Sequence, residues 1–174
     1  MPSIPAQALY NACLAGDAAA VSRLLPAGGT QLNLSGPRFQ HPDPTSKSTP
    51  LIEAAFGGHT AIVRMLLERA PNTTVDYVAV HGATALIAAA QYHRADVVRL
   101  LADRGNVNFT NQRGCTPLRF VLMGIPSDSL PRDRDPDGAR ELATVRALLR
   151  LGAGTLPPRS YIPFLTPPPS RNPI

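Results

Sequence analysis

The residue best placed for chemistry in this sequence is Glu53, a single carboxylate in an apolar stretch. Its neighbours are Ile52 and Ala54. Apolar surroundings disfavour the charged form and raise the pKa of a carboxyl group, which can then act as a general acid or base. Tyr10 or His81 would assist such a proton transfer. These three residues define a candidate catalytic site for an enzyme or a small-molecule binder.

A structural role for Glu53 is the alternative. A carboxylate in such surroundings is more often hydrogen-bonded within the fold or paired with an arginine, and Arg113 and Arg119 are the partners considered. The catalytic hypothesis also requires a pocket, which the segment 34–48 would cover. An open surface at that point would count against an enzyme.

The other reactive residue types form no catalytic or metal-binding pattern. The four histidines include no pair spaced H-x-x-x-H and no H-E-x-x-H, which argues against a metal site. No phosphate-binding loop or dinucleotide-binding glycine motif occurs, so no cofactor is expected. Cys13 is expected to be a small buried residue, and Cys115 an exposed turn residue.

The elements that must position these residues follow an internal repeat. Leucines anchor four similar segments, at Leu9, Leu51, Leu86 and Leu118. In each, apolar or small residues at i, i+3 and i+4 form one face of a short helix. A second apolar block follows each anchor and is displaced to about residues 145–149 in the last segment. Each unit is therefore predicted to be a pair of short helices.

The same segments carry the motifs of a known family. They read T-P-L-x-x-A-A at 49–55, G-H at 58–59, I-V-x-x-L-L at 62–67, T-A-L at 84–86 and T-P-L at 116–118. On these motifs the chain resembles an ankyrin-repeat protein over residues 6–154. The resemblance implies an all-α solenoid with a concave surface that holds another protein. It also implies a structural role for His59 in the turn between two helices.

Departures from a regular period divide the chain further. The spacing from Leu9 to Leu51 is about nine residues longer than the 33-residue ankyrin period. Residues 1–154 are expected to form the repeat domain, and residues 155–174 a proline-rich extension in which prolines favour extended backbone. The repeats are predicted at about 6–33, 45–76, 80–108 and 112–154, with insertions at 34–48 and 125–139.

The resemblance also implies where a partner binds. In this family, contacts come from the turn tips and from the groove face of the first helix in each unit. Phe56, Tyr92 and Met123 are assigned to equivalent helical positions and would line a ridge along the groove. Aromatic and methionine side chains are enriched at interfaces. The predicted partner-binding residues are Phe39, Phe56, His81, Gln91, Tyr92, Arg113, Arg119 and Met123.

Composition and charge narrow the classes of function. The net charge is +5, but the arginines are spread over all units and only 5% of residues are aromatic, which disfavours nucleic-acid binding. No apolar run is long enough to span a membrane. The first eight residues lack the features of a secretory signal, so a cytoplasmic or nuclear location is expected.

Two functions are open on the sequence. The first is a protein–protein interaction module that binds a peptide or protein on the concave groove. The second is an atypical ankyrin-fold enzyme or small-molecule binder, for instance in secondary metabolism, with proton transfer by Glu53 in a pocket under the segment 34–48.

Overall fold

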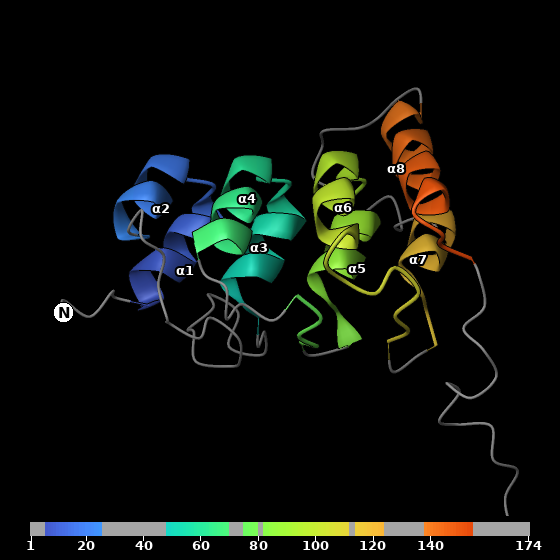
Figure 1. Ribbon diagram of the computed structural model, residues 1–174, viewed down its shortest axis with the longest axis horizontal. Coiled ribbons are helices and arrows are strands. Elements are labelled where there is room, and N and C mark those ends of the chain that lie inside the picture. Colours follow the sequence, from blue (N-terminus) through green and yellow to red (C-terminus); the bar gives the residue numbers. More distant parts are fainter. Residues whose placement is uncertain are drawn as a thin grey trace, which may run out of the picture.

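The structure is a computed structural model in which α-helices form four consecutive pairs (Figure 1). It describes residues 6–25, 48–69, 75–79, 82–111, 114–123 and 138–154, and no residue in these ranges lies in a β-strand. The all-α repeat architecture predicted from the sequence is therefore confirmed. The four pairs are unit 1, with α1 (Ala6–Ala15) and α2 (Ala18–Leu24); unit 2, with α3 (Pro50–Gly57) and α4 (Thr60–Arg69); unit 3, with α5 (Ala85–Gln91) and α6 (Ala95–Ala102); and unit 4, with α7 (Pro117–Met123) and α8 (Ala139–Arg150).

Two layers of helices run along the molecule. The first helices α1, α3, α5 and α7 pack against one another in order, and the second helices α2, α4, α6 and α8 do the same beside them (Figure 1). Each unit therefore packs on its neighbours in the stack. None of the described helices is long and apolar enough to cross a bilayer.

Threonine hydroxyls begin the first helices of units 2 to 4. Thr49 accepts a hydrogen bond from the Ile52 N–H at 3.3 Å, and Thr84 accepts one from the Ile87 N–H at 3.2 Å. Thr116 does the same for α7. Each bond satisfies a backbone donor that has no partner within the helix. The T-P-L and T-A-L motifs thus fix where these helices begin.

Small residues set the distance between units. Ala54, Ala55, Ala89 and Ala90 are fully buried on the faces where α3 and α5 meet their neighbours. With only a methyl group at each position, the helix backbones can approach closely. Leucine, valine and isoleucine from both layers fill the rest of the core. This explains how a chain with so few aromatic residues buries enough surface to fold.

Side chains from one unit cover glycines of the unit before it. Gly16 has φ +74°, and a Cβ at this position would collide with the imidazole of His59. Gly58 has φ +78° and lies under the aliphatic part of Arg94 in the same way. Left-handed backbone favours glycine, and the missing side chains leave room for His59 and Arg94.

Arginines join the second helices at their carboxyl ends. Arg69 donates through Nη1 to the carbonyl of Leu25 at 3.3 Å, and Arg104 donates through Nη1 to the carbonyl of Leu67 at 3.0 Å. The carbonyls at a helix C-terminus lack helical partners and carry partial negative charge. Both arginines therefore stabilise contacts between successive units.

The last unit departs from the pattern in two ways. α8 begins at Ala139, which the sequence had placed in the insertion 125–139, and its first turn projects above the neighbouring helices (Figure 1). Leu149 of α8 is 54% exposed, whereas Leu67, at the equivalent position of α4, is 8% exposed. Leu67 packs against a following unit, and no described unit follows Leu149. The predicted insertion residues 34–47 and 125–137 and the extension 155–174 lie outside the described residues.

We expect Gly16→Ala to lower the free energy of unfolding by more than the backbone penalty alone. An alanine at this position must keep the left-handed backbone, which costs about 1–2 kcal/mol. Its methyl group must also displace the His59 ring. Gly114→Ala is the matched control, because Gly114 has φ +69° and open space around its Cβ position. Urea denaturation measures both. Equal losses for the two variants would show that the His59 contact contributes nothing.

We expect stability to depend on the protonation of His59. Burial and then the neighbouring Arg94 lower the pKa of the imidazole in the folded state. The folded state therefore resists protonation, and its stability is complete above the unfolded-state pKa of about 6.5 and declines at lower pH. His59→Gln should flatten the decline in unfolding free energy between about pH 7 and pH 5. If the unfolding free energies of His59→Gln and the unmodified protein depended on pH in the same way, this prediction would be contradicted.

Candidate functional site

Phe56 and Tyr92 form an aromatic pair across units 2 and 3. Their ring centroids are 4.2 Å apart and their planes are tilted by 59°. Phe56 lies in the last turn of α3 and is 40% exposed. Tyr92 is the residue at which α5 ends, and it is half-buried. The contact brings together two predicted partner-binding residues from different units.

The two aromatic residues do not occupy equivalent positions, contrary to the sequence prediction. Counting from the anchoring leucines Leu51 and Leu86, the counterpart of Phe56 is Gln91, and Tyr92 comes one residue later. His93 aligns with Gly58 and shares its left-handed backbone, with φ +55°. Tyr92 stands where unit 2 has Gly57, and its ring contacts Phe56 of the preceding unit.

Arg94 fixes the end of α3 beside the aromatic pair. Its Nε atom donates to the carbonyl of Phe56 at 3.3 Å. Arg94 stands where unit 2 has His59, so the turn of unit 3 has an arginine in place of the family histidine. The backbone that carries Phe56 is therefore held by a residue of the following unit.

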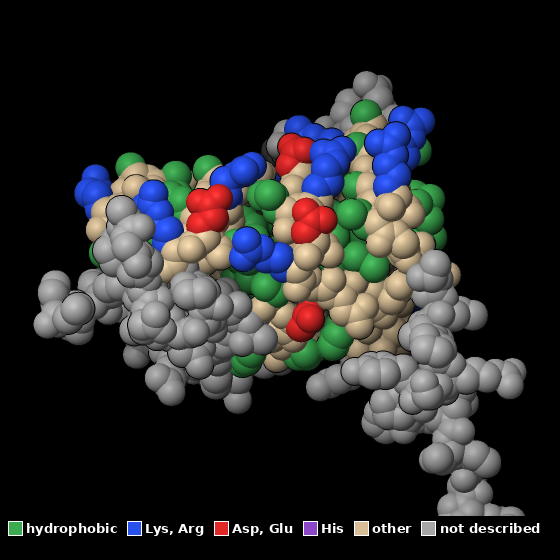
Figure 2. Space-filling view, viewed as in Figure 1, with side chains coloured by type: hydrophobic (Ala, Val, Ile, Leu, Met, Phe, Trp, Pro, Cys, Tyr) green, Lys and Arg blue, Asp and Glu red, His purple; other side chains and the backbone are tan. Residues whose placement is uncertain are grey.

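The two layers differ in charge. In α3 and α5 the only ionisable side chain is Glu53, and it is buried. The second helices instead carry exposed arginines at equivalent positions, and Figure 2 shows basic side chains gathered over the upper parts of α6 and α8. The first-helix layer of units 2 and 3 thus offers an uncharged surface with an aromatic pair. The exposed arginines are Arg23, Arg64, Arg99 and Arg146.

The other predicted partner-binding residues are placed in part. Gln91 is the last residue of α5 and is half-buried, and Arg119 is exposed on α7. Met123 is the last residue of α7, but its side chain is outside the described part of the structure. Three further predicted residues lie outside the described residues altogether. They are Phe39, His81 and Arg113.

The candidate catalytic residues Tyr10 and Glu53 are in contact. The Tyr10 hydroxyl donates to Glu53 Oε1 at 3.1 Å, between α1 and α3. Both side chains are buried. The carboxylate is therefore hydrogen-bonded to the preceding unit. In the first-helix layer α5 lies between α3, which carries Glu53, and α7, which carries Arg119.

The surroundings of this pair suppress ionisation of nearby groups. Burial and the adjacent Glu53 carboxylate raise the pKa of Tyr10 above its ordinary value. The same two causes raise the pKa of the Cys13 thiol to about 12. Tyr10 and Cys13 therefore stay protonated at neutral pH, and Cys13 is the buried, unreactive residue that the sequence predicted. Cys115, expected to be exposed, is also buried, and its N–H donates to Asn111 Oδ1 at 3.0 Å.

The chain was compared with models of known protein families. A family model described as ankyrin repeats (3 copies) matches residues 9–113, more than half of the chain. The chain belongs to the ankyrin-repeat family. Ankyrin repeats are in general protein-interaction modules and usually bind other proteins. The match ends before α7, so the helix pair of unit 4 lies beyond it.

This ankyrin-repeat protein has one feature that the sequence did not predict. A hollow of about 380 Å³ lies where units 2, 3 and 4 meet. Its lining includes Arg94, Arg99 and Arg140, and it does not involve Tyr10 or Glu53. Two sequence signals accompany it, the insertion between α7 and α8 and the replacement of the G-G-H turn by Y-H-R in unit 3. Neither signal indicates by itself that the two changes meet in space.

We expect Tyr10→Phe to destabilise the protein by about 1–3 kcal/mol, because it removes a hydrogen-bond donor from a buried carboxylate. Tyr77→Phe is the control, since Tyr77 is half-buried and remote from Glu53 in sequence, and its effect should stay within about 0.5 kcal/mol. Thermal or urea unfolding measures both free energies. Equal free energies of unfolding for Tyr10→Phe and the unmodified protein would mean that the Tyr10–Glu53 hydrogen bond contributes nothing to stability.

Proposed function

We propose that this protein binds a peptide or protein segment on the free face of its first-helix layer, around Phe56 and Tyr92. The observation that carries the proposal is the aromatic pair itself. A ring that is 40% exposed and already packed against a second ring offers a rigid apolar contact. Such residues are typical of interface hot spots.

The distribution of charge supports this surface over the opposite one. The cores of protein interfaces are depleted in charged residues and enriched in aromatic ones. The first helices of units 2 and 3 meet both conditions, whereas α4 and α6 carry exposed charges such as Arg64 and Asp96. A partner that buries Phe56 would therefore desolvate few charges.

The fixed backbone around Phe56 also favours binding. Arg94 bonds to the Phe56 carbonyl, and Tyr92 contacts the ring, so the side chain is restrained before a partner arrives. Binding then costs less conformational entropy than it would for a freely rotating side chain. The partner class is a protein segment with an apolar side chain that packs on these rings.

Affinity capture from a lysate of the source cells tests the proposal. Phe56→Ala and Tyr92→Ala should each reduce recovery of the specific partner by about tenfold, since hot-spot truncations cost more than 1 kcal/mol. Leu149→Ala is the matched control, because it truncates another exposed apolar side chain, at the end of the stack. Circular dichroism checks that all three variants fold. Equal recovery with all three variants would place the binding surface elsewhere.

A further inference from the structure

Unit 4 exposes large apolar side chains on both of its helices. Leu122 of α7 is 64% exposed, and Leu142 and Leu149 of α8 are 49% and 54% exposed. Val145 lies between these two leucines on the same side of α8 and is half-buried. We call these four residues the end face. Three of the five large apolar side chains that are exposed among the described residues belong to it, so exposed apolar surface is concentrated at this unit.

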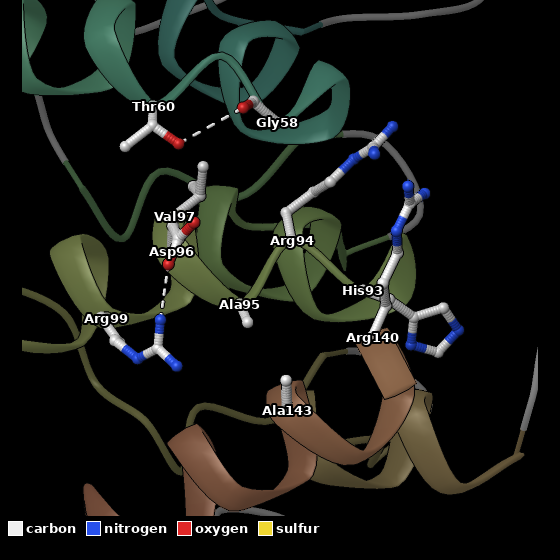
Figure 3. A pocket seen from close by; sticks show the side chains of 10 residues that line it. All are labelled: Gly58, Thr60, His93, Arg94, Ala95, Asp96, Val97, Arg99, Arg140 and Ala143. Atoms are coloured by element: carbon white, nitrogen blue, oxygen red, sulfur yellow. Dashed lines mark hydrogen bonds and ion pairs between the residues drawn. The ribbon is translucent and has the colours of Figure 1, made fainter. Parts of the chain in front are cut away.

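The same positions are covered in units 2 and 3, each of which has a further unit behind it. The equivalents of Leu122 are Ala55 and Ala90, and both are fully buried. The equivalents of Val145 are fully buried as well, and those of Leu142 line the hollow between units (Figure 3). These equivalents are Val63 and Val98 for Val145, and Thr60 and Ala95 for Leu142. The end face is therefore the side of unit 4 on which a following unit would pack.

The end face is also more apolar than the corresponding faces of units 2 and 3. Leu122 replaces an alanine, and Leu142 replaces a threonine or an alanine. A repeat that closes a stack against water needs a polar outer face, and contiguous exposed apolar surface marks a contact site. The side chains of unit 4 therefore suit a surface that is covered by another segment.

The size of Leu122 argues against a further helix pair as the occupant. In units 2 and 3 the alanines Ala55 and Ala90 are buried where successive first helices pack. Leucine is larger by an isopropyl group, and a packed interface accepts such an addition only if the backbone moves apart. A second copy of the chain that continued the stack would meet the same obstacle. An extended segment can instead follow the contours of the leucines.

The chain supplies such a segment directly after unit 4. Its starting point is fixed, because the Gly154 N–H donates to Asn108 Oδ1 at 3.0 Å. A Cβ at Gly154 would lie 3.6 Å from Leu118 Cδ2 of α7, so the extension 155–174 begins against the unit that carries the end face. The extension is rich in proline and contains a cluster of large apolar residues. These are Tyr161, Ile162, Phe164 and Leu165.

The extension is long enough to reach the whole end face. Polyproline backbone rises about 3.1 Å per residue, so Tyr161 could lie up to roughly 22 Å from Gly154. The helix α8 has twelve residues and is therefore about 18 Å long. Proline also lacks an N–H, so fewer backbone donors lose water when the segment covers leucines. Its restricted backbone loses less conformational entropy on binding than a flexible chain would.

We propose that the end face binds the extension 155–174 of the same chain, with residues 161–165 packed on its leucines. The extension takes the place of a further repeat and covers the apolar end of the stack. This contact is separate from the proposed peptide surface around Phe56 and Tyr92, and neither proposal depends on the other.

Nuclear Overhauser effects between aromatic and methyl protons of the full chain test the proposal directly. We expect them between the Phe164 ring and the leucine methyl groups of the end face. A mixed sample of ¹³C-labelled and unlabelled chains separates contacts within one molecule from contacts between two, and contacts within one molecule support the proposal. Contacts only between molecules would identify a second copy as the occupant and contradict it. Contacts of the end face with residues 124–137 instead, or with no residue of the extension, would contradict it as well.

Substitutions in the extension and on the end face form a double-mutant cycle. The pair Phe164→Ser and Leu165→Ser should raise the equilibrium constant of unfolding in urea by about tenfold, because two large apolar side chains return to water. The pair should have a smaller effect when Leu142→Ser has already weakened the end face. Ile174→Ser is the matched control, because it removes an apolar side chain of the extension outside the cluster, and it should leave the constant unchanged.

Three results of this cycle would overturn the proposal. The first is no change in the unfolding constant with Phe164→Ser and Leu165→Ser. The second is an equal effect of that pair with and without Leu142→Ser, and the third is an equal loss with Ile174→Ser.

Discussion

Close contact between neighbouring units is the constraint on which the rest of this structure depends. A pair of helices of seven to twelve residues cannot bury its own apolar face, so stability must come from stacking. The buried alanines Ala54, Ala55, Ala89 and Ala90 set how near the first helices lie. Every polar contact between units is possible only at that separation.

Polar side chains also stabilise the stack, both at the turns between paired helices and near the carboxyl ends of the second helices. His59 and Arg94 cover glycines of the preceding unit, and Arg69 and Arg104 bond to its terminal carbonyls. Part of the positive charge of the chain therefore serves contacts between units. Glu53 belongs to the same class of contacts, because its carboxylate accepts a hydrogen bond from Tyr10 of the unit before it.

The stack separates two kinds of surface. The first helices of units 2 and 3 carry no exposed ionisable side chain and present Phe56 against Tyr92, which suits an apolar protein segment. The second-helix layer is charged, and its hollow beside α6 and α8 concentrates arginines and helix N-termini. Arg94 contacts both surfaces, since it donates a hydrogen bond to the backbone of Phe56 and also lines the hollow.

The sequence by itself determined the repeat, because leucine and alanine positions, threonine caps and turn glycines are local signals that recur in each unit. It placed Phe56 and Tyr92 in one predicted surface, and it identified Tyr10 and Glu53 as associated residues. Only the tertiary structure decided that the rings of Phe56 and Tyr92 meet, that Tyr10 donates a hydrogen bond to Glu53, and that residues of units 2, 3 and 4 line one hollow. The physical reason is that each of these features depends on how one unit lies against the next, and contacts between units are not encoded in the spacing within a single unit.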